Sequence, residues 1–84
     1  MKIVVKKFVI RVFNPETSSP IYFLKDGLGF ANVYSPLVAT KCNSHKEAED
    51  FIPEIFDITW EISGQNYKPF ENKVLFIEEI YVKE

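Results

Sequence analysis

Cys42 and His45 are the only cysteine and the only histidine in the chain, and they stand three positions apart at the start of a predicted helix. A helix N-terminus can lower the pKa of a nearby thiol, and a histidine can accept its proton, so the pair could form a nucleophile and its base. Catalysis would also need a group that orients the base and donors that hold an oxyanion, and no motif supplies either. A single cysteine beside a helix cap is more often a small buried residue. We therefore expect no catalytic residue and no enzymatic activity.

No metal, cofactor or phosphate motif accompanies this pair. One cysteine and one histidine fall short of the three or four ligands of a zinc site, and the acidic residues lack the spacing of a calcium loop. The short run Gly27-Leu28-Gly29 lacks the rest of a phosphate-binding loop and belongs to a predicted turn. We expect neither a metal nor a cofactor.

Acidic residues are the next feature that could carry function. Six of the twelve fall within fifteen positions, with Lys46 as the nearby base: Glu47, Glu49, Asp50, Glu54, Asp57 and Glu61. Such a cluster could attract a basic protein surface, for example the nucleic-acid channel of a host enzyme. The alternative is a solvated helix face whose first acids favour the helix dipole.

Aromatic residues supply further candidates for a protein interface, where tyrosine and tryptophan are enriched. Tyr34 and Tyr67 lie beside predicted loops and are the better candidates for partner binding. Trp60 stands between Ile58 and Ile62 in an alternating segment, so we expect its side chain in the core.

A basic N-terminal strand offers a different function, the binding of nucleic acid. Its basic residues alternate with Phe8 and Phe13 in the sequence: Lys2, Lys6, Lys7 and Arg11. The whole chain has a net charge of -2 and a pI of about 5.4, whereas a surface that follows phosphates usually has a clear basic excess. Nucleic acid is therefore the least favoured partner.

The helix that positions Cys42 and the acids has a clear start. Ser44 can accept a hydrogen bond from the Glu47 backbone while the Glu47 carboxylate reaches back to the Ser44 backbone, which is a capping box. An apolar stripe follows at helical spacing: Ala48, Phe51, Ile52 and Ile55. Because Pro53 cannot donate to the carbonyl four residues earlier, the helix either ends near Ile52 or continues as a second turn to Phe56.

Strands are predicted on both sides of this helix by β-branched and alternating runs, at residues 2–13, 21–25, 28–34, 37–42, 58–62 and 74–83. Residues 67–73 contain Pro69 and are best placed at a sheet edge. Asp26-Gly27 predicts a two-residue turn. Its register sets three pairs opposite each other: Lys25 and Leu28, Phe23 and Phe30, Tyr22 and Ala31.

The last strand, residues 74–83, is apolar on both faces. This predicts either an inner position in the sheet or an outer face that another part of the chain or a partner covers. Its acids suit antiparallel pairing with the basic first strand. The elements together predict an α+β fold: an antiparallel sheet of about four to six strands with one main helix, residues 44–52 or on to 56, packed on one face.

Length and composition place the chain among small globular domains. Its 84 residues, 46% hydrophobic and 26% charged, suit one domain that spans 1–84. We read no signal peptide and no apolar run of membrane-spanning length, so we expect no membrane association. A single cysteine excludes an internal disulfide and fits a cytoplasmic location.

Five segments in order resemble small uncharacterised accessory proteins that phages and prophages of low-GC Gram-positive bacteria encode. These segments are Phe8-Val9-Ile10-Arg11, Pro20-Ile21-Tyr22-Phe23-Leu24, Ala39, Ser44-His45-Lys46-Glu47-Ala48-Glu49 and Leu75-Phe76-Ile77-Glu78-Glu79-Ile80. The chain departs from that pattern at residues 58–73, which look inserted, and at Cys42, where an aromatic residue is common.

The resemblance implies a phage origin and a location in the host cytoplasm. Accessory phage proteins of this size often bind a host protein and alter it, so we expect a non-enzymatic protein that modulates or inhibits a host protein, in host takeover or against host defence. One alternative is a structural protein that self-associates into a homo-oligomer through its final strand. The third is a nucleic-acid accessory protein that uses the basic first strand.

Overall fold

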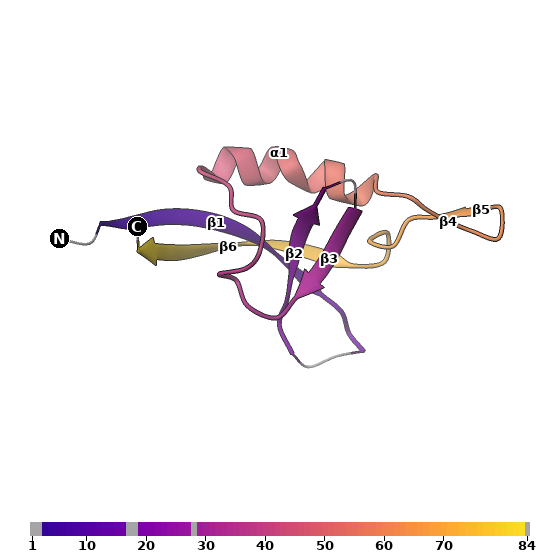
Figure 1. Ribbon diagram of the computed structural model, residues 1–84, viewed down its shortest axis with the longest axis horizontal. Coiled ribbons are helices and arrows are strands. Elements are labelled where there is room, and N and C mark those ends of the chain that lie inside the picture. The colour runs from indigo at the N-terminus through magenta and orange to yellow at the C-terminus, as the bar shows by residue number, and fades with distance from the viewer. Residues whose placement is uncertain (1–2, 17–18, 28, 84) are drawn as a thin grey trace.

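The computed structural model describes residues 3–16, 19–27 and 29–83 and has an α+β fold (Figure 1). A four-stranded antiparallel sheet, a two-stranded sheet and one helix confirm the predicted class. The elements in chain order are β1 (Val4–Phe13), β2 (Ile21–Asp26), β3 (Gly29–Val33), α1 (His45–Phe56), β4 (Trp60–Ile62), β5 (Gln65–Tyr67) and β6 (Val74–Lys83).

The first and last strands form the longest pairing in the molecule. β1 and β6 pair antiparallel over ten residues, from Val4 opposite Lys83 to Phe13 opposite Val74, which confirms the predicted pairing of the two termini. The Lys6 Nζ lies 3.0 Å from the Glu79 carboxylate, so the opposite charges meet as expected. The strand order is β3-β2-β1-β6, which makes β6 an edge strand. The inner position, one of the two alternatives for this strand, is therefore wrong.

The β2–β3 hairpin has a different register from the predicted one. Phe23 pairs with Asn32 and Lys25 with Phe30, which moves every pair by two residues; the predicted partner of Lys25, Leu28, lies outside the described residues. A shift of two keeps each side chain on its predicted face. The rings of Phe23 and Phe30 still stack, at 6.0 Å, as diagonal neighbours.

A gap between β1 and β2 is the feature that shapes the rest of the fold. The two strands pair only at Arg11–Tyr22 and Val12–Ile21 and then separate. Thr40 and Cys42 fill the gap: the Thr40 N–H donates to the Phe23 carbonyl, and Cys42 exchanges two backbone hydrogen bonds with Phe8. The strand predicted at residues 37–42 is therefore wrong, since this segment forms one isolated bridge and otherwise turns.

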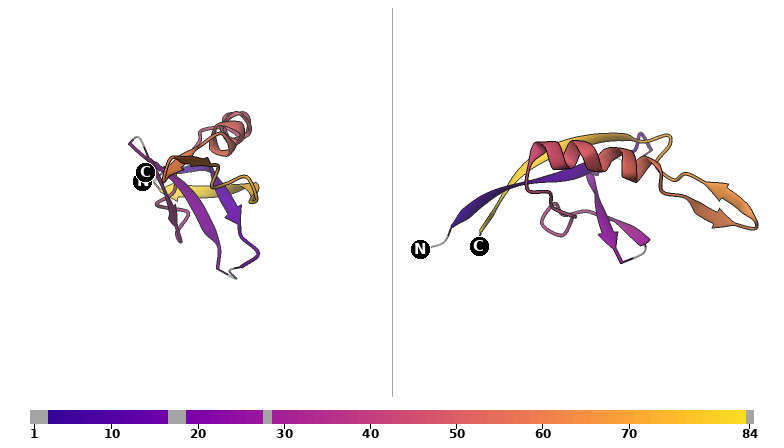
Figure 2. Two further views of the ribbon diagram at one scale, coloured as in Figure 1. Left: turned by 90° about the vertical axis from the view of Figure 1, so that its right-hand side faces the viewer. Right: turned by 90° about the horizontal axis from the view of Figure 1, so that it is seen from above.

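The helix is continuous through Pro53 and ends at Phe56, so the longer of the two predicted alternatives is correct. It packs over β1 and β6, as Figure 2 shows from above. Ala48 and Ile55 are fully buried against the sheet.

The core has two parts, one on each face of the sheet. On the face under α1, the cluster includes Ile10, Phe23 and Phe70. On the opposite face, which we call the outer face, Val9 and Tyr22 are covered by Ala39 from the loop after β3. The outer face has no helix above it, and that loop is its cover among the described residues.

The β4–β5 hairpin extends from one end of the molecule, whose long dimension is 53 Å (Figure 1). β4 is shorter than the strand predicted at residues 58–62, and β5 is not among the predicted strands. Tyr67 ends β5, at an edge of the two-stranded sheet, and residues 69–72 form turns. Trp60 is 49% exposed, so its expected place in the core is wrong. Phe70, in the turns that follow, is 2% exposed and occupies the core position instead.

Candidate functional site

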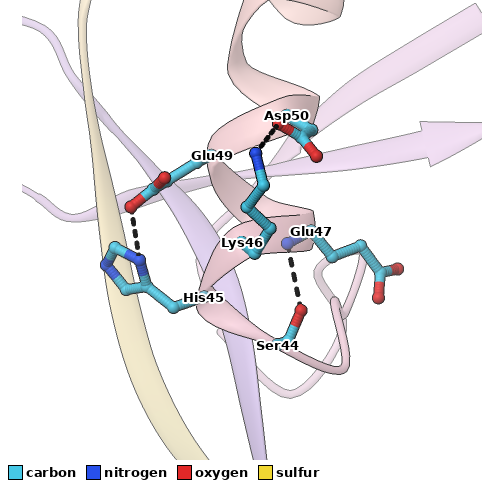
Figure 3. A network of polar contacts seen from close by, with 6 residues as sticks. All are labelled: Ser44, His45, Lys46, Glu47, Glu49 and Asp50. Carbon is cyan, nitrogen blue, oxygen red and sulfur yellow. Dashed lines mark hydrogen bonds and ion pairs between the residues drawn. The ribbon is translucent and has the colours of Figure 1, made fainter.

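The start of α1 forms the polar network of Figure 3. Ser44 Oγ accepts a hydrogen bond from the Glu47 N–H at 3.0 Å, as the capping box predicts. The reciprocal bond differs, because the Glu47 carboxylate accepts from the Asn43 N–H at 3.1 Å and not from Ser44. The carboxylate of Glu47 is therefore already engaged in holding the chain that enters the helix.

We expect Ser44→Ala to lower the free energy of unfolding by about 0.5–2 kcal/mol, because the Glu47 N–H loses its acceptor. Ser44→Asp keeps an oxygen in reach of that N–H and is expected to remain close to wild type. Urea unfolding followed by circular dichroism measures both variants. Equal loss in the two variants would contradict a capping role.

The six clustered acids are less available than the sequence suggests. Two are paired along α1, Glu49 with the His45 Nδ1 at 2.7 Å and Asp50 with the Lys46 Nζ at 3.1 Å. A third, Asp57, lies 3.9 Å from the Lys68 Nζ. All these pairs are exposed and contribute little to stability, yet Lys46 and Lys68 offset the charges of Asp50 and Asp57.

The acids also point in different directions. In Figure 3, Glu49 lies on one side of the helix while Glu47 and Asp50 lie on the other. Glu61 is on the separate β4–β5 hairpin, paired with Asn66 across the strands. The cluster predicted from spacing is therefore spread over two elements and two sides of a helix.

A groove lies between α1 and the β2–β3 hairpin, on the side of the helix that carries Glu47 and Asp50. Its volume is about 500 Å³, with Glu54 on the helix side and Lys25 and Lys41 on the opposite side. A smaller apolar hollow of about 150 Å³ continues from it between Phe30 and Ile58. Thr40 and Cys42, which fill the gap between β1 and β2, also line this groove. Three lysines balance the three acids that line it, so the groove has no strong charge of either sign.

Cys42 contributes to the groove wall, but its environment opposes reactivity. Burial raises the pKa of the thiol, and the negative charge of Glu47 raises that pKa further. Only 3% of the residue is exposed. His45 is directed elsewhere, since it pairs with Glu49 and its ring meets the edge of Phe8 at 5.8 Å. The arrangement is that of a structural cysteine.

We expect the Cys42 thiol to react slowly with a thiol reagent in the folded protein and rapidly in denaturant. Because its pKa is raised in the folded state, the associated stability is fully present below the ordinary thiol pKa of about 8.5 and is lost as pH rises through the folded pKa. Cys42→Ala has no thiol to titrate, so we expect it to lack this loss of stability at alkaline pH. Urea unfolding of both proteins at neutral and alkaline pH checks the difference, and identical pH profiles would contradict it.

Two of the basic residues of β1 are also engaged. Lys6 pairs with Glu79, and the Lys7 Nζ donates to the Asn43 side-chain oxygen. Lys2 lies outside the described residues. Two of the basic residues proposed to contact phosphate thus have partners within the chain, which weakens the nucleic-acid alternative.

Exposed aromatic residues gather on one face of the β4–β5 hairpin. Trp60 pairs with Tyr67 across the strands, and Ile62 lies on the same face. Their exposed fractions are 49%, 46% and 54%. Tyr34, the other predicted interface tyrosine, is 76% exposed and lies after β3, in a loop that also exposes Leu37 and Val38. Tyr67 could be predicted as an interface residue from the sequence, whereas Trp60 and Ile62 could not, because their alternation is equally typical of a buried strand.

The described residues contain no group of three or more His, Cys, Asp or Glu side chains that could hold a metal ion. Within the same ranges, no helix combines the length and apolar character needed to cross a membrane. None of the protein-family models, curated proteins and solved structures compared with the chain matches it.

Proposed function

We propose that the protein is a non-enzymatic binding module that modulates or inhibits a host protein, as expected for a phage-type accessory protein. The observation that carries the proposal is the exposed face of the β4–β5 hairpin, formed by Trp60, Ile62 and Tyr67. Tryptophan and tyrosine supply much of the binding energy at protein interfaces. The resemblance of five chain segments to phage accessory proteins supports the choice of a host partner.

The position of the hairpin suits contact with another protein. It extends away from the helix and the four-stranded sheet (Figures 1 and 2). Trp60 stacks on Phe30 at 5.0 Å, which holds one face of the indole while about half of the residue remains exposed. A side chain held in this way loses little conformational entropy when it binds.

Acidic residues near the hairpin favour a partner with a basic surface. Glu61 lies on the opposite face of the hairpin from Trp60, and Asp57, whose charge Lys68 offsets in part, follows the end of α1 just before it. Long-range attraction between such charges raises association rates and depends on ionic strength. Glu54 adds a third carboxylate from the last turns of α1, at the groove.

Affinity capture from a lysate of a low-GC Gram-positive bacterium tests this proposal. A host protein should be retained by the wild type and lost with the double variant Trp60→Ala/Tyr67→Ala. Leu37→Ala is the matched control, because Leu37 is 61% exposed on a loop far from the hairpin in sequence. Retention of one protein by all three versions, or by none, would overturn the proposed contact.

The contribution of charge is tested separately by Glu61→Lys, which changes the net charge by the same amount as its control. We expect weaker capture by this variant, with the difference from wild type shrinking as salt is added. Glu49→Lys is the control, since Glu49 faces His45 on the other side of α1. An effect of equal size in both variants would indicate net charge alone rather than a defined contact.

A further inference from the structure

The outer edge of β6 is the longest strand edge without a neighbour among the described residues. β1 occupies one edge of β6 along all ten residues, and the strand order ends at β6. Free edges of this kind are usually protected by a short strand, a proline or a bulge. β6 has ten residues in regular register and no proline, and its central charges are Glu78 and Glu79.

The side chains of β6 add an apolar surface to this edge. Val74 and Phe76 lie on the outer face and are 51% and 50% exposed. Ile80, on the same face, is half-buried against Val9 and Tyr22. On the other face, Leu75 and Ile77 pack against the core under α1. The edge is thus apolar on both sides, as a strand inside a larger sheet is.

We propose that β6 pairs antiparallel with β6 of a second copy of this chain, about a twofold axis that sets Ile77 of one copy opposite Ile77 of the other. A twofold axis perpendicular to the sheet places the outer faces of both copies on the same side. Residues opposite each other must then lie on the same face. One residue of β6 must therefore lie opposite its own copy across the axis, and we name each possible axis by that residue.

Charge selects among the possible axes. An axis at Glu78 or Glu79 would place that carboxylate directly opposite its own copy, which is unfavourable. An axis at Ile77 instead sets Val74 opposite Ile80 and Phe76 opposite Glu78. It also places Lys73, which directly precedes β6, diagonal to Glu79 of the second copy, within reach of a long side chain.

The remaining choice, between an axis at Ile77 and an axis at Ile80, depends on how much exposed apolar surface each axis covers. An axis at Ile80 pairs as many residues of β6 as an axis at Ile77, but its pairs begin at Ile77 opposite Lys83 and leave Val74 and Phe76 uncovered. The axis at Ile77 brings both of these exposed residues into the pairing. A second copy therefore completes the edge and reduces the exposed apolar surface at once.

Two substitutions at one exposed position test the pairing. Residue 76 faces Glu78 of the second copy, so Phe76→Glu should weaken the dimer about tenfold relative to Phe76→Lys, because each dimer contains this pair twice. Both variants lose the same aromatic ring, and their difference isolates charge. Sedimentation equilibrium gives the dissociation constants. A wild type that stays monomeric at its highest soluble concentration, or equal constants for the two variants, overturns the proposal.

Cross-linking tests the axis itself. Opposed strands place the two residues on the axis about 4.5–5.5 Å apart, which is within the range of a disulfide. Ile77→Cys should therefore form a linked dimer on mild oxidation, whereas Val82→Cys should not, because residue 82 lies opposite residue 72 beyond the strand. Efficient linkage through Val82→Cys, or none through Ile77→Cys in a protein with a native circular dichroism spectrum, contradicts this axis.

Discussion

Replacing Phe23 by alanine is expected to lower the free energy of unfolding by about 3–5 kcal/mol. Phe23 is 1% exposed and is among the largest fully buried side chains. Its ring meets Phe30 at 6.0 Å, and Phe51 and Phe70 at 5.5 Å each. These contacts join β3, α1 and the turns before β6 to β2, so the cavity would affect several segments at once.

Whether Phe23→Ala still folds depends on how this loss compares with the total free energy of unfolding. Domains of this length have a free energy of unfolding of roughly 4–13 kcal/mol, at about 0.05–0.15 kcal/mol per residue. We therefore expect Phe23→Ala to be largely unfolded or to unfold at a much lower urea concentration. Phe13→Ala is the control, because Phe13 is 46% exposed on the outer face. Equal losses in the two variants would show that the aromatic cluster does not organise the core.

Several parts of the fold could be predicted because their causes are local. The cap at Ser44 depends on residues within three positions of each other, and the helix stripe repeats at a fixed period. The pairing of β1 with β6 is long-range, but the opposite charges and the apolar runs of both strands agree on it. Features that are consistent at several levels are the ones that sequence reasoning recovers.

One error, the strand expected at residues 37–42, has its physical origin in the gap between β1 and β2. Nothing in the local sequence of β2 predicts that its pairing with β1 stops after Tyr22. The gap draws Thr40 and Cys42 in as backbone partners, which replaces the strand expected at residues 37–42. Thr40 and Cys42 then line the groove beside α1, and no sequence motif marks this lining.

Trp60 and Phe70 show a second limit. An alternating segment fits a buried strand and an exposed hairpin equally well, and only tertiary contacts separate the two. Phe70 lies between turns with no periodic neighbours, yet it stacks edge to face with Phe23 and fills the core. Phe70, which has no periodic pattern around it, is therefore buried, whereas Trp60, which has a clear one, is half exposed.

The acidic residues illustrate why a binding site is harder to predict than a fold. Their number and spacing are sequence properties, but their available charge depends on partners such as Lys68, which is eleven positions from Asp57. The direction of each carboxylate depends on its position around α1 (Figure 3). The hairpin face is a better guide to a partner because about half of each of Trp60, Ile62 and Tyr67 stays exposed in the folded chain.

The second large effect is expected at Ala39, where aspartate should abolish cooperative unfolding or cost at least several kcal/mol. Ala39 is 3% exposed and packs on Val9 and Tyr22, where it closes the outer face of the sheet. A carboxylate at this position would be buried without a partner, and an uncompensated buried charge costs about 3–5 kcal/mol. The side chain would also exceed the space left for a methyl group.

Val38→Asp supplies a neighbouring control, because Val38 is 55% exposed in the same loop. We expect it to remain within about 0.5 kcal/mol of wild type, as surface substitutions usually do. Urea unfolding followed by circular dichroism compares the two variants. If Ala39→Asp unfolded like Val38→Asp, the loop would not pack on the sheet, and Val9 and Tyr22 would be open to solvent. A large loss confined to Ala39→Asp would instead establish that Ala39 is packed against the sheet and closes this half of the core.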